Sequence, residues 1–293
     1  MSRAVIEGPR ETRAAPVRVM VQRFGWWTRA THAVLALSVF GLVFTGMPLK
    51  YADTAWATLL IRVWGSAYRA GFFHRAFAIA FFFAGGMHVG GLVAAAVRRR
   101  FPAVTGPDSI VLGPRDLRHI GQYLGYLRGK GPRPDFGRYT YWEKFDYFAE
   151  IWGLLVIGLT GLMMWFPELA ARFLPGWIVN AALIFHSYEA LLAAAFLFAI
   201  HFFNTHLRPD TFPVDRVMFS GRLPLDEVRE RYPGWYRRIV DGGGGDLEVA
   251  PERSHLAAAI VSVVFLTLGI AMLLLVMSAA VAEAGRYLLD LLG

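Results

Sequence analysis

Five long apolar stretches divide the sequence and restrict the folds open to it. They cover residues 26–47, 70–97, 145–166, 177–206 and 255–282. Each holds about 20 or more apolar residues, enough for a helix to cross the ~30 Å hydrocarbon core of a bilayer. Helices satisfy their own backbone hydrogen bonds in lipid, so stretches of this length predict an all-α, polytopic membrane protein.

The chain contains no cysteine, which limits the metal chemistry open to it. Disulfides, thiolate metal sites, iron–sulfur clusters and covalent heme attachment are all excluded within this chain. Any heme must therefore be held through histidine or methionine, and any iron–sulfur cluster must belong to a partner. Residues 1–25 are polar and rich in arginine without a short apolar core, so no cleavable signal peptide is expected.

Lysine and arginine are unevenly distributed between the connections. They are concentrated in residues 1–25, 98–144 and 207–254, whereas the third connection has only Arg172 and the C-terminal tail only Arg286. The positive-inside rule then places the N-terminus and both long loops in the cytoplasm and the C-terminus outside a plasma (inner) membrane. The net charge of +8 is explained by this bias, so we expect membrane lipid and no nucleic acid as a partner.

The polar connections suggest four parts. Residues 1–25 form a cytoplasmic N-terminal segment, and residues 26–240 form a bundle of four transmembrane helices with their loops. Residues 241–254 contain the run Gly242–Gly245 and are predicted to form a flexible linker. Residues 255–293 add an extra C-terminal transmembrane helix.

Six histidines lie within or at the edges of the apolar stretches, where ionisable side chains are costly and usually functional. They are His32, His74, His88, His186, His201 and His206. The separations within the second and fourth stretches are 14 residues (His74 to His88) and 15 residues (His186 to His201). In an α-helix these separations leave the two side chains about 40° and about 60° apart, so each pair faces one bundle interior.

The predicted topology sorts these histidines into two depths. His74 and His186 form an outer level, and His32, His88 and His201 form an inner level with His206 below it. Two histidines on different helices at one depth can hold a heme iron between them, and a bundle core is a usual place for such a site. Two matched levels predict at least two b-type hemes.

Other interpretations of the same residues remain. A single membrane histidine often only hydrogen-bonds a neighbouring helix, as in a structural anchor. A divalent-metal transporter would combine histidine with carboxylates near the midplane, but here the histidines lie toward the two faces and carboxylates are few. Glu150, Glu189 and Asn204 are the polar candidates. We consider Glu150 and Asn204 for contact with a quinone or its protons. A paired structural carboxylate is an equal alternative for either glutamate.

Several short stretches together resemble a known family over about residues 18–240. They are Arg23-Phe24 through His32, Gly71–His74, Gly158–Gly161 with Trp165–Pro167, Leu183–His186, Ile200-His201, Gly221-Arg222 and Tyr232–Arg237. They are similar to the cytochrome b (gamma) subunit of respiratory formate dehydrogenases, within the di-heme membrane cytochromes b.

The resemblance implies roles for individual residues. The positions matching His74 and His186 would bind the outer heme, and those matching His32 and His201 the inner heme. Menaquinone or ubiquinone would react beside the inner heme. Electrons would be exchanged near the outer heme with an iron–sulfur or multiheme cytochrome c subunit, which serves a catalytic subunit. The chain itself would carry no chemistry beyond quinone reduction or quinol oxidation.

The sequence departs from the family pattern at three places. The histidines of the fourth stretch are 15 residues apart where the family has 14, and the fifth stretch is additional. His88 has no counterpart, so it could replace His32 as the inner ligand. A triheme variant would instead use His88 together with His206. A histidine-based metal transporter without heme is the remaining alternative.

Overall fold

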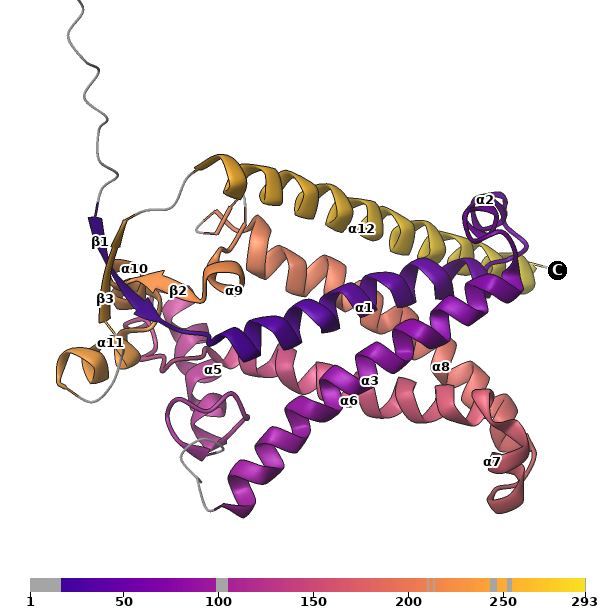
Figure 1. The fold of residues 1–293 in the computed structure, drawn as a ribbon, viewed down its shortest axis with the longest axis horizontal. Helices are drawn as coiled ribbons and strands as arrows, with labels where there is room; N and C mark the ends of the chain where they lie inside the picture. The colour runs from indigo at the N-terminus through magenta and orange to yellow at the C-terminus, as the bar shows by residue number, and fades with distance from the viewer. Residues whose placement is uncertain are drawn as a thin grey trace, which may run out of the picture.

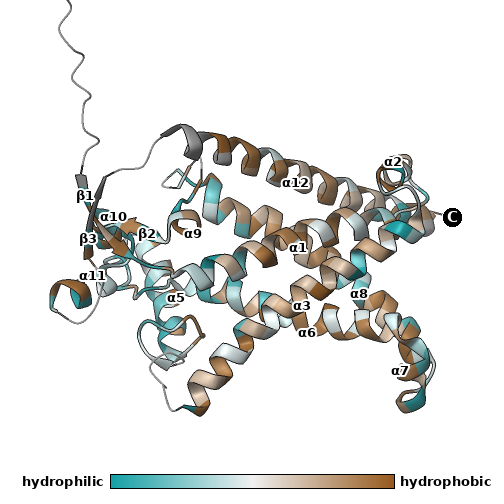
Figure 2. Ribbon diagram, viewed as in Figure 1, coloured by the Kyte–Doolittle hydropathy of each residue, from teal (hydrophilic) through white to brown (hydrophobic). Residues whose placement is uncertain are grey.

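The computed structural model describes residues 17–98, 105–209, 211–212, 214–242, 247–251 and 255–292. In these ranges five helices are long and apolar enough to cross a membrane, which confirms the predicted spans. They are α1 (Trp26–Lys50), α3 (Ala67–Val97), α6 (Tyr141–Trp165), α8 with its continuation (Trp177–Leu207) and α12 (His255–Leu292). Figure 2 shows apolar residues along these helices and more hydrophilic residues at the sheet end.

Shorter helices connect or flank the spans. They are α2 (Ala55–Trp64), α5 (Pro114–Leu127), α7 (Pro167–Phe173), α9 (Val217–Ser220), α10 (Leu225–Arg231) and α11 (Pro233–Val240). Local capping explains where two spans begin. Ser66 accepts a hydrogen bond from the Arg69 backbone N–H at the start of α3, and Thr140 and Glu143 form a reciprocal capping box at the start of α6.

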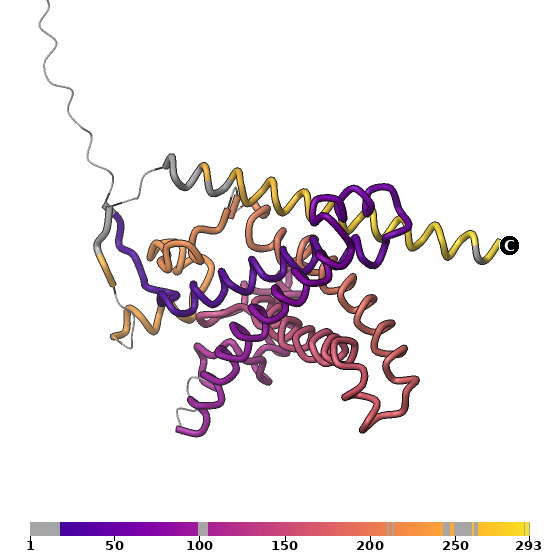
Figure 3. Tube along the Cα trace, turned by 45° about the vertical axis from the view of Figure 1, so that its right-hand side comes forward, coloured from indigo at the N-terminus to yellow at the C-terminus, as the bar shows by residue number. Residues whose placement is uncertain are grey.

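Four of the spans form two helix pairs. The chain packs α1 along α3 and α6 along α8, and α3 meets α6 where the two pairs cross (Figure 1). Figures 1 and 3 both show α12 running beside α1, and it also contacts α8. The four-helix unit with an additional fifth helix is therefore observed, with α12 packed on it.

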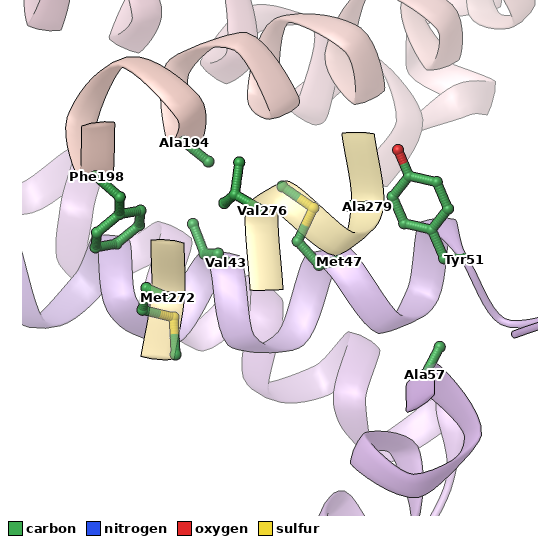
Figure 4. Packing of buried hydrophobic residues seen from close by; sticks show 9 residues of the cluster. All are labelled: Val43, Met47, Tyr51, Ala57, Ala194, Phe198, Met272, Val276 and Ala279. Carbon is green, nitrogen blue, oxygen red and sulfur yellow. The ribbon is translucent and has the colours of Figure 1, made fainter. Parts of the chain in front are cut away.

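Buried apolar side chains hold α12 against the bundle. They are Val43, Met47, Tyr51, Ala57, Ala194, Phe198, Met272, Val276 and Ala279 (Figure 4). A Cβ built on Gly269 would collide with the Phe202 ring, so a larger residue at this point of α12 would require the ring to move.

The fourth span changes its winding near its end. It is α-helical through Phe196, and then forms two π-helical segments, η1 (Leu197–His201) and η2 (Phe203–Leu207). A π-turn closes on residue i+5 rather than i+4, so it holds one residue more than an α-turn. Residues 197–207 are consequently turned relative to the positions an ideal α-helix would give them.

A small antiparallel sheet, which was not predicted, closes one end of the bundle. Its strands are β1 (Val17–Gln22), β2 (Arg222–Pro224) and β3 (Leu247–Pro251), in the order β2-β1-β3. Val21 pairs with Leu223 on β2 and with Leu247 on β3. β1 belongs to the expected N-terminal segment and β3 to the expected linker. Val21 and Leu223 join Val228 and Trp235 in a second apolar core.

A buried arginine ties this end to the bundle. Arg23 is 1% exposed, and its guanidinium donates to Tyr232 Oη at 2.7 Å and to Glu143 Oε1 at 2.9 Å. Tyr232 Oη also donates to Glu143 Oε1 at 2.9 Å. Burial alone disfavours the charge of Arg23, but the Glu143 carboxylate outweighs it and holds the Arg23 pKa above its usual value. The N-terminal strand, the start of α6 and the α10–α11 segment are thereby joined.

Candidate functional site

The two outer histidines face one another across the bundle. His74 on α3 and His186 on α8 have ring centres 6.2 Å apart, with the ring planes inclined at 73°. Both side chains are partly buried. The structure therefore brings together the two residues that the sequence placed at one depth.

Hydrogen bonds fix which ring nitrogen of each outer histidine is free. Nδ1 of His186 lies 2.9 Å from the Ile157 carbonyl oxygen, which can only accept, so Nδ1 carries the proton. Nδ1 of His74 lies 2.9 Å from Thr45 Oγ1, whose own proton goes to the Gly41 carbonyl at 2.7 Å. Thr45 is thus the acceptor, and both histidines keep Nε2 as an unprotonated nitrogen able to bind a metal.

Glycine makes room for each of these rings. A Cβ built on Gly46 would lie 3.0 Å from Cε1 of His74, and one built on Gly161 would lie 3.0 Å from Cε1 of His186. Each glycine directly follows a threonine, Thr45 on α1 and Thr160 on α6. Sequence reasoning did not assign either threonine, although the repeated Thr-Gly pair in two different spans was a usable signal.

A large cavity adjoins the outer histidines. Its volume is about 1170 Å³, above the ~300–1,000 Å³ typical of small-molecule sites. The lining is mainly apolar and comes from α1, α3, α6 and α8, and both His74 and His186 contribute to it. Glu150 and Glu189 are among its few polar residues. The cavity has the size and the apolar walls that a porphyrin ring requires.

The spacing of the two rings also suits a single metal between them. An imidazole nitrogen binds a transition metal at about 2 Å. It lies about 1.1 Å from its ring centre, because the ring bonds are about 1.3–1.4 Å long. Two imidazoles on opposite sides of one metal therefore have ring centres roughly 6 Å apart, close to the observed 6.2 Å.

The donor set favours heme iron over a bare metal ion. Within the described ranges, no three or more His, Cys, Asp or Glu side chains gather into a metal-binding group. Two imidazoles are enough for an iron whose other four positions are filled by a porphyrin, whereas protein zinc sites normally use three or four side chains. The residues present therefore fit heme.

At the inner level, His201 has a carboxylate partner that the sequence analysis missed. Asp146 on α6 is 9% exposed, and its Oδ2 lies 3.2 Å from Nδ1 of His201. The carboxylate accepts the Nδ1 proton, so His201, like the outer pair, has Nε2 free. Asp146 and Glu150 are four residues apart in an otherwise apolar span, and this spacing could have identified them as one polar face.

His32 on α1 lies within electrostatic range of His201 and His206. The three histidines therefore share one region of the bundle. Asn204 lies on η2 between the last two, is partly buried, and is not among the residues that line the cavity.

His88 and His206 form hydrogen bonds that differ from those of His74, His186 and His201. Nε2 of His88 lies 3.0 Å from Tyr147 Oη, so this histidine contacts α6 through the nitrogen that His74, His186 and His201 keep free. Nδ1 of His206 accepts from the Asp215 backbone N–H at 3.3 Å, which leaves the proton of a neutral ring on Nε2. In these arrangements neither residue offers a free Nε2.

The π-helical turn η1 lies between His186 and His201. Because it holds one residue more than an α-turn, the separation of 15 residues covers about the same turns and rise as 14 residues of α-helix. The one residue in excess of the 14-residue spacing expected from the resemblance thus has a local structural cause, and His201 lies beside Asp146.

Comparisons with known proteins bear on the family of this chain. The family model described as prokaryotic cytochrome b561 matches residues 23–208, which include the four bundle spans and all six membrane histidines. The cytochrome b556(Fdn) subunit of nitrate-inducible formate dehydrogenase from Escherichia coli K12 is 24% identical over 223 residues, covering 75% of this chain and 92% of that subunit. The cytochrome b556(fdo) subunit of formate dehydrogenase from the same strain is 26% identical over 106 residues, covering 36% of this chain and 47% of the subunit. The resemblance expected from the sequence is confirmed.

Proposed function

Because the chain belongs to the prokaryotic cytochrome b561 family, it is a membrane cytochrome b in electron transfer, and we propose that it holds two b hemes at two depths. Through them it carries electrons between a partner oxidoreductase and the quinone pool. The observation that carries the proposal is shared by His74, His186 and His201. Each donates Nδ1–H to an acceptor and keeps Nε2 for a metal, as metal-bound histidines regularly do.

The outer heme is assigned to His74 and His186, which face one another beside the cavity. The inner heme is assigned to His201 and, by the resemblance, to His32, which lies in the same region of the bundle. The two levels are about 20 Å apart along the fourth span at ~1.5 Å per residue, so together they bridge most of a ~30 Å hydrocarbon core. Bound heme supplies a one-electron iron couple at each level.

A third heme held by His88 and His206 is less well supported. Tyr147 occupies Nε2 of His88, and the Asp215 backbone N–H occupies Nδ1 of His206. Ligation through Nε2 of either residue would require the loss of one of these hydrogen bonds. Two hemes per chain are therefore proposed, and a measured ratio near three would point to His88 and His206.

For the quinone, either menaquinone or ubiquinone, we assign Glu150 as the group that exchanges protons. Glu150 lines the cavity and lies one helical turn from Asp146, which contacts His201. A carboxylate on the wall of a mainly apolar cavity, one turn from the partner of the inner histidine, supports this role. Asn204 is a second candidate because it lies on η2, the π-helical segment that follows η1 and His201.

The proposed partners and orientation follow from the relatives and from charge. Both E. coli relatives are named as cytochrome b556 subunits of formate dehydrogenases. By analogy, this chain would serve a catalytic subunit through an iron–sulfur or multiheme cytochrome c subunit. The bias of Lys and Arg supports a cytoplasmic N-terminus and an external C-terminus in the plasma (inner) membrane. Residues 26–240 are the proposed cytochrome domain, and residues 255–293 the appended helix.

Anaerobic reduction by quinol tests this function. Membranes containing the full chain should show a b-type spectrum that a menaquinol or ubiquinol analogue reduces. Glu150→Gln should slow this reduction while dithionite still reduces the same amount of heme. Glu189→Gln, which also alters a cavity-lining carboxylate, is the matched control and should react like the wild type. A colourless protein that moves divalent metal would instead support the transporter alternative.

A further inference from the structure

The α5 helix has two different faces, and one is anchored to the bundle. Asp116 is 2% exposed, and its Oδ2 accepts from Lys144 Nζ at 3.0 Å. One turn further along, the His119 ring lies 5.5 Å from that of Phe136. Because Lys144 is the fourth residue of α6, these contacts fix α5 beside the first turn of a transmembrane span.

Aromatic residues mark the same level as a membrane boundary. The Tyr123 ring on α5 lies 5.8 Å from that of Tyr141, the first residue of α6. Trp142 and Phe145 follow on α6 and are 39% and 42% exposed. Tyrosine and tryptophan concentrate where membrane helices pass the lipid headgroups. The anchored face therefore holds α5 at the depth of the headgroups.

A second face of α5 is apolar and uncovered. Leu117, Ile120, Leu124 and Leu127 are 75%, 36%, 46% and 62% exposed. Their spacing of three, four and three residues places them in one stripe along the helix. A continuous stripe of large apolar side chains is unfavourable in water, so a partner surface is expected.

The charges around this stripe indicate an anionic partner. Arg115, Arg118, Arg128 and Lys130 are exposed, and none has an ion pair within the described part of the chain. The acidic residues of the same connection are already occupied, because Asp108, Asp116 and Asp135 pair with Arg238, Lys144 and Arg237. The segment therefore presents unpaired positive charge beside an apolar stripe.

We propose that α5 lies in the membrane interface, with its leucine stripe inserted among the lipid chains and its free cations bound to the phosphates of anionic lipids. An amphipathic helix with basic and apolar sides is suited to this position. Cations next to a membrane span attract anionic headgroups. The inference does not depend on the hemes, since none of these residues lies in the proposed heme sites.

The absence of cysteine permits a direct test on the full chain. Leu117→Cys provides a labelling position in the stripe. Gln122→Cys provides a comparison position at an exposed residue about 140° away around the helix. Each variant would carry an environment-sensitive fluorophore in nanodiscs of neutral or anionic lipid. We expect lipid-borne quenchers to reach the label at 117 and water-soluble quenchers to reach the label at 122. An unchanged heme spectrum would verify folding.

In anionic lipid, the label at 117 should lie deeper in the membrane than in neutral lipid. The triple change Arg115→Gln, Arg118→Gln and Arg128→Gln should abolish this effect of lipid charge on depth. Equal access of water-soluble quencher to both labels in both lipids would overturn the proposal. It would equally be overturned if the label at 117 became protected only when partner subunits were added, because the stripe would then be a protein interface.

Discussion

Asp146 Oδ2 and His201 Nδ1 lie 3.2 Å apart, which gives the inner histidine a charged acceptor. The outer histidines instead donate to neutral oxygens, a threonine hydroxyl for His74 and a backbone carbonyl for His186. A carboxylate draws the Nδ1 proton more strongly, which makes the ring a better electron donor to a bound metal. The two heme levels should therefore differ in how strongly the protein stabilises the oxidised iron.

Replacement of Asp146 by asparagine should raise the midpoint potential of one heme. Asn keeps the size and a hydrogen-bond acceptor but removes the charge that favours the oxidised state. The expected rise is about 60 mV for each ~1.4 kcal/mol of stabilisation lost in a one-electron couple. A spectroscopic redox titration measures it. A shift of both hemes, or of neither, would contradict the assigned contact. Thr160→Val, near His186, is the control and should leave the inner heme unchanged.

Enlargement of Gly46 should remove the outer heme selectively. A Cβ at this position would lie 3.0 Å from the His74 ring, so Gly46→Val pushes the ring away from its place opposite His186. Heme per protein should fall from about two to about one, measured by pyridine hemochrome against protein concentration. Gly90→Ala is the matched control because its Cβ would meet nothing within 4 Å. Equal heme loss in both variants would indicate general damage rather than a specific clash.

Removal of the Glu143 charge should destabilise the end of the bundle that carries the sheet. Glu143→Gln leaves the buried Arg23 guanidinium without its counter-charge. Loss of one partner of a fully buried pair costs about 3–5 kcal/mol. A smaller loss is expected here because the Glu143 side chain is 33% exposed. Thermal unfolding in detergent measures the change. The double variant Arg23→Gln with Glu143→Gln should recover part of the loss, and an additive result would exclude coupling.

The features that could be predicted from the sequence are those that one local property decides. Length and hydropathy are enough to define the five spans, because lipid leaves a long apolar stretch few alternatives to a helix. The pairing of His74 with His186 was also predictable, since both depend only on depth and helical phase. Asp146 was not predicted because it is the second residue of the predicted stretch 145–166, where a carboxylate stands out less than Glu150 does further inside.

Other features depend on contacts that no local pattern contains. β1 pairs with a strand that follows it by about 200 residues. The alternating valines of β1 (Val17, Val19 and Val21) are a usable strand signal, but β2 has only three residues and no local pattern shows which segments pair. The π-turn η1 changes the direction of the His201 side chain relative to an α-helix, and η1 contains no proline or glycine from which the change could be predicted. His88 fits the 14-residue phase from His74, yet its partner is Tyr147, which only the position of α6 determines.

Heme content in ligand variants of the full chain tests the central claim most directly. The reduced-minus-oxidised spectrum and the heme-to-protein ratio would be compared for His74→Ala, His186→Ala and His201→Ala. We predict that the first two variants lose the same heme and keep the other, whereas His201→Ala loses only the heme that they retain. Loss of different hemes from His74→Ala and His186→Ala, or a wild-type protein without b-type heme despite an adequate heme supply, would contradict the account.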